Sequence, residues 1–139
     1  MNKVLGLDLG STTCGVALSD SLGMIATPKD TIRFQPDDYD SALEAVCKWI
    51  DDNKVDTVVL GLPKHMNGDE GIRADISKKF KDMILEKRDV KVILWDERLT
   101  TVSAQKSMIA SNMNRNKRHK MIDAMAAQII LQSYLDSRC

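Results

Sequence analysis

Hydrophobic residues follow two different periods along the chain, and the change between them predicts where strands give way to helices. Residues 4–9 and 14–19 form two short apolar runs around a polar turn, which predicts an antiparallel hairpin. A short third strand is expected over 31–34. From residue 38 the apolar positions recur at helical spacing, so the pattern predicts an amphipathic helix over 38–53.

The rest of the chain alternates strands with helices. The pattern predicts strands at 56–60 and 90–95 and helices at 70–88, from Thr100 or Thr101 to 111, and at 118–136. A meander followed by alternating strands and helices is typical of a mixed sheet covered by helices, so we expect one α/β domain spanning 1–139. Open sheets of this kind bind ligands beyond the carboxyl ends of their strands.

Composition excludes several classes of protein. The chain has 139 residues, of which 43% are hydrophobic and 29% charged, as in an ordinary globular protein rather than a disordered one. No apolar run approaches the roughly 20 residues that a membrane span needs, so we expect no membrane partner. Cys14, Cys47 and Cys139 are too widely spaced for a disulfide framework or a zinc site. Without a secretory signal, the cytoplasm is the simplest location.

Charge is distributed unevenly, although 20 basic and 20 acidic residues cancel to a net charge of zero. Residues 36–75 hold four basic and ten acidic side chains, a net of −6, whereas residues 76–139 hold thirteen and seven, a net of +6. A neutral total therefore does not exclude a basic face that binds nucleic acid. Solvated helix faces are the alternative interpretation of both segments.

Several carboxylates stand where an apolar fold would avoid them. Asp8 interrupts an apolar strand, Asp96 and Glu97 follow directly after another, and Asp123 lies on the apolar face of the last predicted helix, with Ala126 and its neighbours. Each acid could instead cap a turn or form an ion pair. Carboxylates that converge from different elements suit Mg²⁺ or Mn²⁺. Such ions can activate water for attack on a phosphodiester.

Four sequence motifs together resemble one family, the YqgF (RuvX) family of candidate pre-16S rRNA nucleases, which is related to the resolvase RuvC. The motifs are Gly6-Leu7-Asp8-Leu9-Gly10 with Gly15-Val16-Ala17-Leu18-Ser19-Asp20, Gly61-Leu62-Pro63 with Met66, Gly68 and Gly71, Asp96-Glu97-Arg98-Leu99-Thr100-Thr101, and Lys120-Met121-Ile122-Asp123 with Ala126-Ala127 and Ile130-Leu131-Gln132. The resemblance covers nearly the whole chain. Many members carry a basic residue in the first turn, where this chain has Ser11-Thr12-Thr13-Cys14.

The resemblance implies an RNase H-like fold with a five-stranded mixed sheet flanked by helices. It also implies a metal-dependent nuclease that matures the 5′ end of 16S rRNA in ribosome biogenesis. By match to the motifs, Asp8, Glu97 and Asp123 would be the catalytic, metal-binding acids, with Asp96 and Asp20 as secondary candidates. Glu97 is preferred to Asp96 because its longer side chain can reach inward from a strand end.

Basic residues near these acids could hold a phosphate backbone. Arg98 follows the acids directly, and the densest basic cluster precedes Asp123; we expect nucleic-acid contacts from Arg98, Arg115, Lys117, Arg118 and Lys120. An ion pair of Arg98 with Asp96 or Asp20 is the alternative. Aromatic residues are too few for base stacking to dominate, which favours recognition of shape and backbone in structured RNA.

Three other functions compete with the nuclease hypothesis for RNA. The same acids would serve a Holliday-junction resolvase acting on branched DNA. Residues 8–13 also resemble the phosphate-binding turn of actin-like sugar kinases, but those proteins need two such domains. A non-catalytic RNA-binding assembly factor is the third alternative. The sequence leaves open the oligomeric state, monomer or dimer, and the need for a ribosomal partner.

Overall fold

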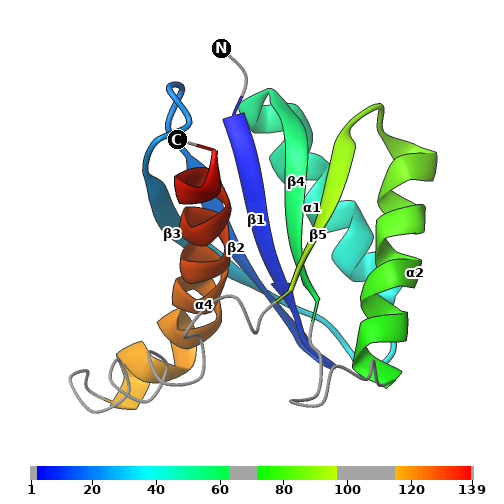
Figure 1. The fold of residues 1–139 in the computed structure, drawn as a ribbon. Coiled ribbons are helices and arrows are strands. Elements are labelled where there is room, and N and C mark those ends of the chain that lie inside the picture. Colours follow the sequence, from blue (N-terminus) through cyan, green and yellow to red (C-terminus); the bar gives the residue numbers. More distant parts are fainter. Residues whose placement is uncertain (1–2, 63–71, 97–114, 139) are drawn as a thin grey trace.

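The computed structural model describes residues 3–62, 72–96 and 115–138 of the chain (Figure 1). Within these residues the elements follow the order β1 (Lys3–Leu9), β2 (Thr13–Ser19), β3 (Ala26–Arg33), α1 (Tyr39–Asn53), β4 (Val55–Leu62), α2 (Ile72–Lys87), β5 (Lys91–Asp96) and α4 (Arg115–Ser137). No described helix has an apolar stretch long enough to cross a membrane.

The strands form one mixed sheet in the order β3-β2-β1-β4-β5. β1 and β2 pair antiparallel, as do β2 and β3, whereas β1, β4 and β5 run parallel to one another. The parallel strands therefore end at the same edge of the sheet, at the bottom of Figure 1, which we name the carboxyl edge. This topology confirms the predicted α/β class with a five-stranded mixed sheet.

Helices cover both faces of the sheet. α1 and α2 lie on one face, where Leu5 and Leu7 of β1 pack with Phe80 and Ile84 of α2 in a fully buried core. α4 lies on the other face, where its apolar residues pack against Val4, Ala17, Ala26 and Val59. Because successive side chains of a strand point to opposite faces, each buried strand contributes to both cores.

The third strand, β3, begins earlier in the chain than the sequence pattern predicted. It was expected over 31–34, but β3 begins at Ala26 and pairs with β2 along its length, with a register shift opposite Val16 and Ala17. The start of β3 was not predicted because Pro28 lowers the strand signal there, even though an edge strand tolerates a proline. The start of β3 is fastened to α4, since the Gln132 side chain accepts a hydrogen bond from the Ala26 N–H at 2.9 Å.

Other predicted elements agree with the structure to within a few residues. The helix predicted over 38–53 is α1, with Asp38 as its N-cap, and the last helix begins at Arg115 rather than 118. The helix predicted from Thr100 or Thr101 to 111 lies outside the described residues.

Two neighbouring residues of α2 test how much the core beneath this helix contributes to stability. Ile84 is fully buried, whereas Leu85 is 42% exposed. We expect Ile84→Ala to lower the free energy of unfolding by about 2–5 kcal/mol, because it removes buried methylene groups and leaves a cavity. Leu85→Ala is the matched control and should cost less than about 1 kcal/mol. Equal losses in urea unfolding would contradict this packing.

Candidate functional site

Asp8 is the acid that β1 places on the α4 face of the sheet. Its neighbours Leu7 and Leu9 belong to the core on the opposite face, so alternation directs Asp8 toward α4. Asp8 is paired across the sheet with Gly15 of β2, near the carboxyl edge. The side chain is half-buried rather than enclosed, which suits a group that meets a ligand.

α4 brings Asp123 to the same place. A Cβ atom built on Gly15 would overlap the carbonyl carbon and oxygen of Asp123 and would lie 3.0 Å from the Ala124 nitrogen. The backbone of α4 at Asp123 therefore rests directly on β2 at Gly15, the partner of Asp8. Asp8 and Asp123, which are far apart in the sequence, are thus close neighbours in the fold.

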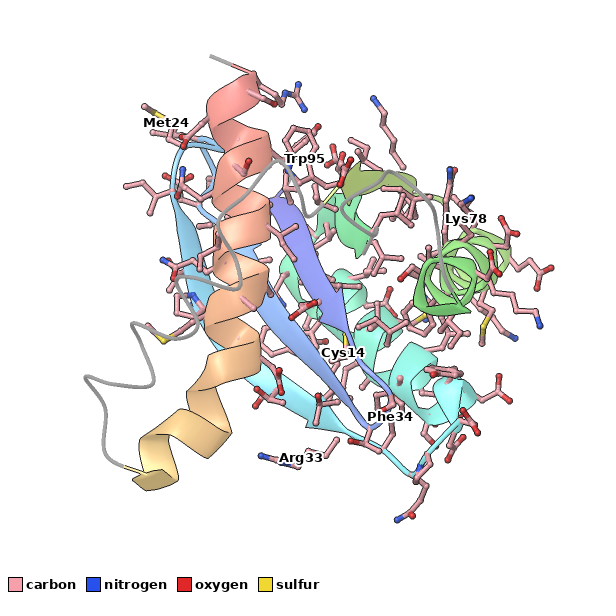
Figure 2. All side chains as sticks on the ribbon, turned by 60° about the horizontal axis from the view of Figure 1, so that its bottom comes forward. Cys14, Met24, Arg33, Phe34, Lys78 and Trp95 are labelled. Carbon is pink, nitrogen blue, oxygen red and sulfur yellow. The ribbon has the colours of Figure 1, made fainter. Side chains whose placement is uncertain are left out.

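Asp8 and Asp123 both affect the pKa of the Cys14 thiol. Cys14 is fully buried in the core beneath the sheet, and its Sγ lies 3.8 Å from the Gly15 carbonyl oxygen, to which it donates (Figure 2). Burial raises the pKa of this thiol well above its usual range, and the negative charges of Asp8 and then Asp123 raise the pKa further. Cys14 therefore stays a neutral core residue, and both carboxylates are near enough to act on its thiol.

Asp96 ends β5 at the carboxyl edge, where it pairs with Leu62 of β4. Its predecessors Val92 and Leu94 pack on the α1 and α2 side, so alternation sets Asp96 on the face opposite Asp8. The described structure therefore does not bring Asp96 to the side of Asp8 and Asp123. Glu97 and Arg98 lie outside the described residues.

The basic cluster before Asp123 falls within α4 or just at its start. Arg115, Lys117, Arg118 and Lys120 belong to the first turns of the helix, but their side chains lie outside the described part of the structure. Among the described residues, no group of three His, Cys, Asp or Glu side chains is arranged to hold a metal ion. The third acid predicted for the metal site, Glu97, lies outside them.

Asp20 lies at the other end of β2 and has a structural role. Its Oδ1 accepts hydrogen bonds from the backbone N–H groups of Met24 at 2.8 Å and Ile25 at 3.3 Å, which closes the turn between β2 and β3. In Figure 2 Met24 lies at the tip of this turn, far from Cys14. The secondary candidate Asp20 is therefore separated from Asp8 by the length of the strand.

Arg33 is a further basic residue near the acids, and the sequence pattern did not single it out. This exposed residue ends β3, where it pairs with Thr13, and the adjacent pair, Ile32 with Cys14, faces the α1 side. Arg33 therefore lies on the α4 face, the same face as Asp8, with only β2 between their strands. The strand predicted over 31–34 already contains Arg33, but the sequence does not show which face of this strand meets α4.

Two cavities of the described structure lie away from the paired acids. One, of about 370 Å³, lies between α1 and α2 and is lined by Cys47 and by the ion pair of Arg88 with Asp51, whose atoms are 2.8 Å apart. The other, of about 670 Å³, is lined by the turn after β2 and the end of α4. Neither of these two cavities is lined by Asp8 or Asp123.

Comparison with known proteins identifies relatives over almost the full length. The family profile RuvX, described as Holliday junction resolvase, matches residues 2–137. A protein of Geobacillus kaustophilus is 48% identical over 136 residues, covering 98% of this chain and 99% of the relative. A Bacillus subtilis protein is 47% identical over 135 residues, covering 97% and 98%. Both are named as candidate pre-16S rRNA nucleases.

Solved structures with little sequence identity share the fold. RuvC of Thermus thermophilus in complex with a Holliday junction substrate superposes with a TM-score of 0.60 at 13% identity, covering 99% of this chain and 96% of RuvC. The fowlpox virus resolvase in complex with Holliday junction DNA gives a TM-score of 0.55 at 15% identity, covering 98% of each chain. The predicted RNase H-like fold is thereby confirmed.

The hydrogen bonds of Asp20 predict how the stability of the protein depends on pH. The hydrogen bond from the Met24 N–H, and then that from Ile25, holds the pKa of Asp20 below its ordinary value of about 3.9. A lowered pKa contributes stability that is present above the ordinary pKa and is lost as the pH falls through the lowered one. We expect Asp20→Ala to destabilise the protein at pH 7, and the difference from wild type to shrink below about pH 4. Thermal unfolding across this range measures it, and a difference independent of pH would contradict it.

Proposed function

Because this chain belongs to the RuvX family, we propose that it is a metal-dependent nuclease that hydrolyses RNA phosphodiester bonds. Its substrate would be pre-16S rRNA, at the 5′ end, during ribosome biogenesis. The single observation that carries the proposal is the convergence of Asp8 and Asp123 where β1 meets α4. We also propose that residues 1–139 act as one domain in the cytoplasm.

The residues present fit a hard divalent cation. Asp8 and Asp123 offer only oxygen donors, and such donors favour Mg²⁺ or Mn²⁺. RuvC-like nucleases generally use divalent metals. Glu97 would complete the set, whereas Asp96 is set on the other face of the sheet and is not proposed as a ligand. Once bound, the metal would lower the pKa of a water and stabilise the negative charge that develops on the phosphate.

The fold keeps the carboxylates of Asp8 and Asp123 in fixed positions. Asp8 is fixed by a central strand with neighbours on both sides, and Asp123 by a helix whose backbone rests on that sheet. Rigid supports of this kind keep ligands in productive geometry without a cost in reorganisation. The alanines at 126 and 127 are fully buried, which lets α4 approach the sheet closely.

Positive side chains around the acids would hold the nucleic-acid backbone. Acids that bind metal would otherwise repel a polyanion, so a basic rim is required. Arg33 lies on the α4 face near the carboxyl edge. We propose that it contacts phosphate together with Arg98, Arg115, Lys117, Arg118 and Lys120.

A second candidate substrate is branched DNA. It is favoured by one observation, the shared fold of this chain with RuvC bound to a Holliday junction. Cleavage of precursor 16S rRNA and of a four-way DNA junction, assayed side by side with Mg²⁺ and with Mn²⁺, distinguishes the two. Cleavage of the junction alone would overturn the RNA assignment, and metal-dependent cleavage of neither substrate would favour a non-catalytic RNA-binding assembly factor.

Substitution of the paired acids tests the nuclease site. We expect Asp8→Asn and Asp123→Asn each to lower the rate of RNA cleavage by more than about a hundredfold, because loss of a metal ligand exceeds the usual effect of losing its supporting partner. Both amides nearly match the carboxylate in size, so circular dichroism should show an unchanged fold.

Asp20→Asn is the control for these variants. It neutralises an acid on the same strand pair, but at the opposite end from Asp8, and should keep the wild-type cleavage rate. Wild-type activity in Asp8→Asn and Asp123→Asn would overturn the metal site. Cleavage that survives a chelator would indicate a different mechanism or a contaminating nuclease.

Arg33 provides a test of the nucleic-acid face. We expect Arg33→Ala to raise KM for RNA and to reduce the slope of log affinity against log salt concentration by about one, as for the loss of one phosphate contact. Lys29→Ala removes an exposed charge earlier in the same strand and is the matched control. If both variants change the salt slope equally, the effect is net charge and the Arg33 contact is refuted.

A further inference from the structure

We propose that Gly15 is a positioning residue of the metal site, because its missing side chain sets the separation between Asp8 and Asp123. The inference rests on the proposed function, since it concerns the same two acids. Gly15 itself would touch neither metal nor substrate. It would act through the path of α4 over the sheet.

Gly15 faces backbone atoms of α4 rather than side-chain atoms. The atoms that a Cβ at this position would overlap are the backbone carbonyl carbon and oxygen of Asp123, and the Ala124 nitrogen is 3.0 Å away. A flexible side chain could swing aside, but a helix backbone cannot. An alanine at position 15 must therefore move the helix itself, at the residue that carries the candidate ligand.

α4 is anchored to the rest of the fold near its C-terminus. Near its C-terminus, the Gln132 side chain donates to the Met24 carbonyl at 2.9 Å and accepts from the Ala26 N–H. The Tyr134 ring packs edge-on against Trp95, with ring centroids 5.7 Å apart. A push at Gly15 would therefore tilt the N-terminal half of α4 away from the sheet rather than shift the whole helix.

Such a tilt of α4 would separate the two acids. Asp8 is cross-strand partner of Gly15, so it stays with the sheet when the helix moves. Asp123 leaves with the helix, and the gap between the two carboxylates widens. A metal ion has narrow limits on its ligand distances, so a wider gap weakens binding.

Gly6 offers a matched control within the same interface. A Cβ on Gly6 would also press on α4, since it would lie 2.7 Å from the Leu131 Cβ and 3.1 Å from the Ala127 carbonyl oxygen. A Cβ at Gly6 would therefore push on α4 at Ala127 and Leu131, which lie closer to the anchored end of the helix than Asp123 does. Gly6→Ala should therefore loosen helix packing while leaving the two acids in place.

The experiment measures Mn²⁺ alone, without RNA. Free Mn²⁺ is followed by electron paramagnetic resonance during titration of the full-length protein, and thermal unfolding is measured on the same samples. We expect Gly15→Ala to bind Mn²⁺ at least about tenfold more weakly than wild type, the usual effect of losing a residue that orients a ligand. Gly6→Ala should lower the melting temperature as well, yet keep the wild-type affinity for Mn²⁺.

A compensating variant separates positioning from a merely structural role. Asp123→Glu lengthens the ligand, so in the Gly15→Ala background it should recover part of the lost Mn²⁺ affinity, whereas in the wild-type background it should weaken binding. If Gly15→Ala does not fold, Ala124→Val replaces it, because a larger side chain at the fully buried Ala124, next to the Asp123 carbonyl that meets Gly15, should also displace this part of α4.

The outcomes distinguish this inference from the proposed function. If Asp8→Asn weakens Mn²⁺ binding but Gly15→Ala does so no more than Gly6→Ala, the positioning role is refuted and the metal site stands. Failure of Asp123→Glu to recover any affinity would also refute it. If Asp8→Asn leaves Mn²⁺ binding unchanged, the proposed metal site itself fails.

Discussion

The structure depends on the close contact between α4 and the strands beneath it. Helices usually stand away from a sheet by the thickness of their side chains, but here glycines of β1 and β2 let the helix backbone rest almost directly on the strands. Ala124, Ala126 and Ala127 are all fully buried in this contact. Dispersion contacts between closely packed groups are individually weak, but many act together, so the helix is held in one position.

This constraint explains how one end of the interface can be apolar and the other can carry charge. Toward the C-terminus of α4, Ile130, Leu131 and Leu135 bury their side chains against the sheet and supply the stability of the contact. At the carboxyl edge, the same register places Asp8 and Asp123 together, although two like charges gain nothing from proximity in the absence of a cation. The apolar end therefore supports an arrangement at the other end that serves function rather than stability.

The opposite edge of the sheet is organised by hydrogen bonds. Asp20 closes the turn that follows β2, and Gln132 joins that turn to α4. The turn leaves Leu22, Met24 and Ile25 exposed, each by more than half of its surface. The structural acid Asp20 and the candidate catalytic acid Asp8 thus lie at opposite ends of the pair formed by β1 and β2. Both are aspartates in the sequence, but their roles differ.

Local patterns in the sequence determined the elements and the chemistry. The periods of apolar residues predicted the hairpin, α1 and the later strands, because those signals arise from neighbours along the chain. An acid within an apolar strand marked Asp8, and an acid on an apolar helix face marked Asp123. Pro28 weakened the signal at the start of β3, and Arg33 was not selected because the sequence does not show which face of that strand meets α4.

Only the tertiary structure decided which of these residues meet. The pairing of β1 with β2 puts Asp8 beside Gly15, and the packing of α4 puts Asp123 over Gly15; neither contact is local in sequence. The same pairings separate Asp20 from Asp8 by the length of a strand and set Arg33 on the face of the acids. Sequence periodicity reports which face of its own element a residue occupies. The distances between elements follow from how closely their backbones can pack, and here that closeness is set where a side chain is missing.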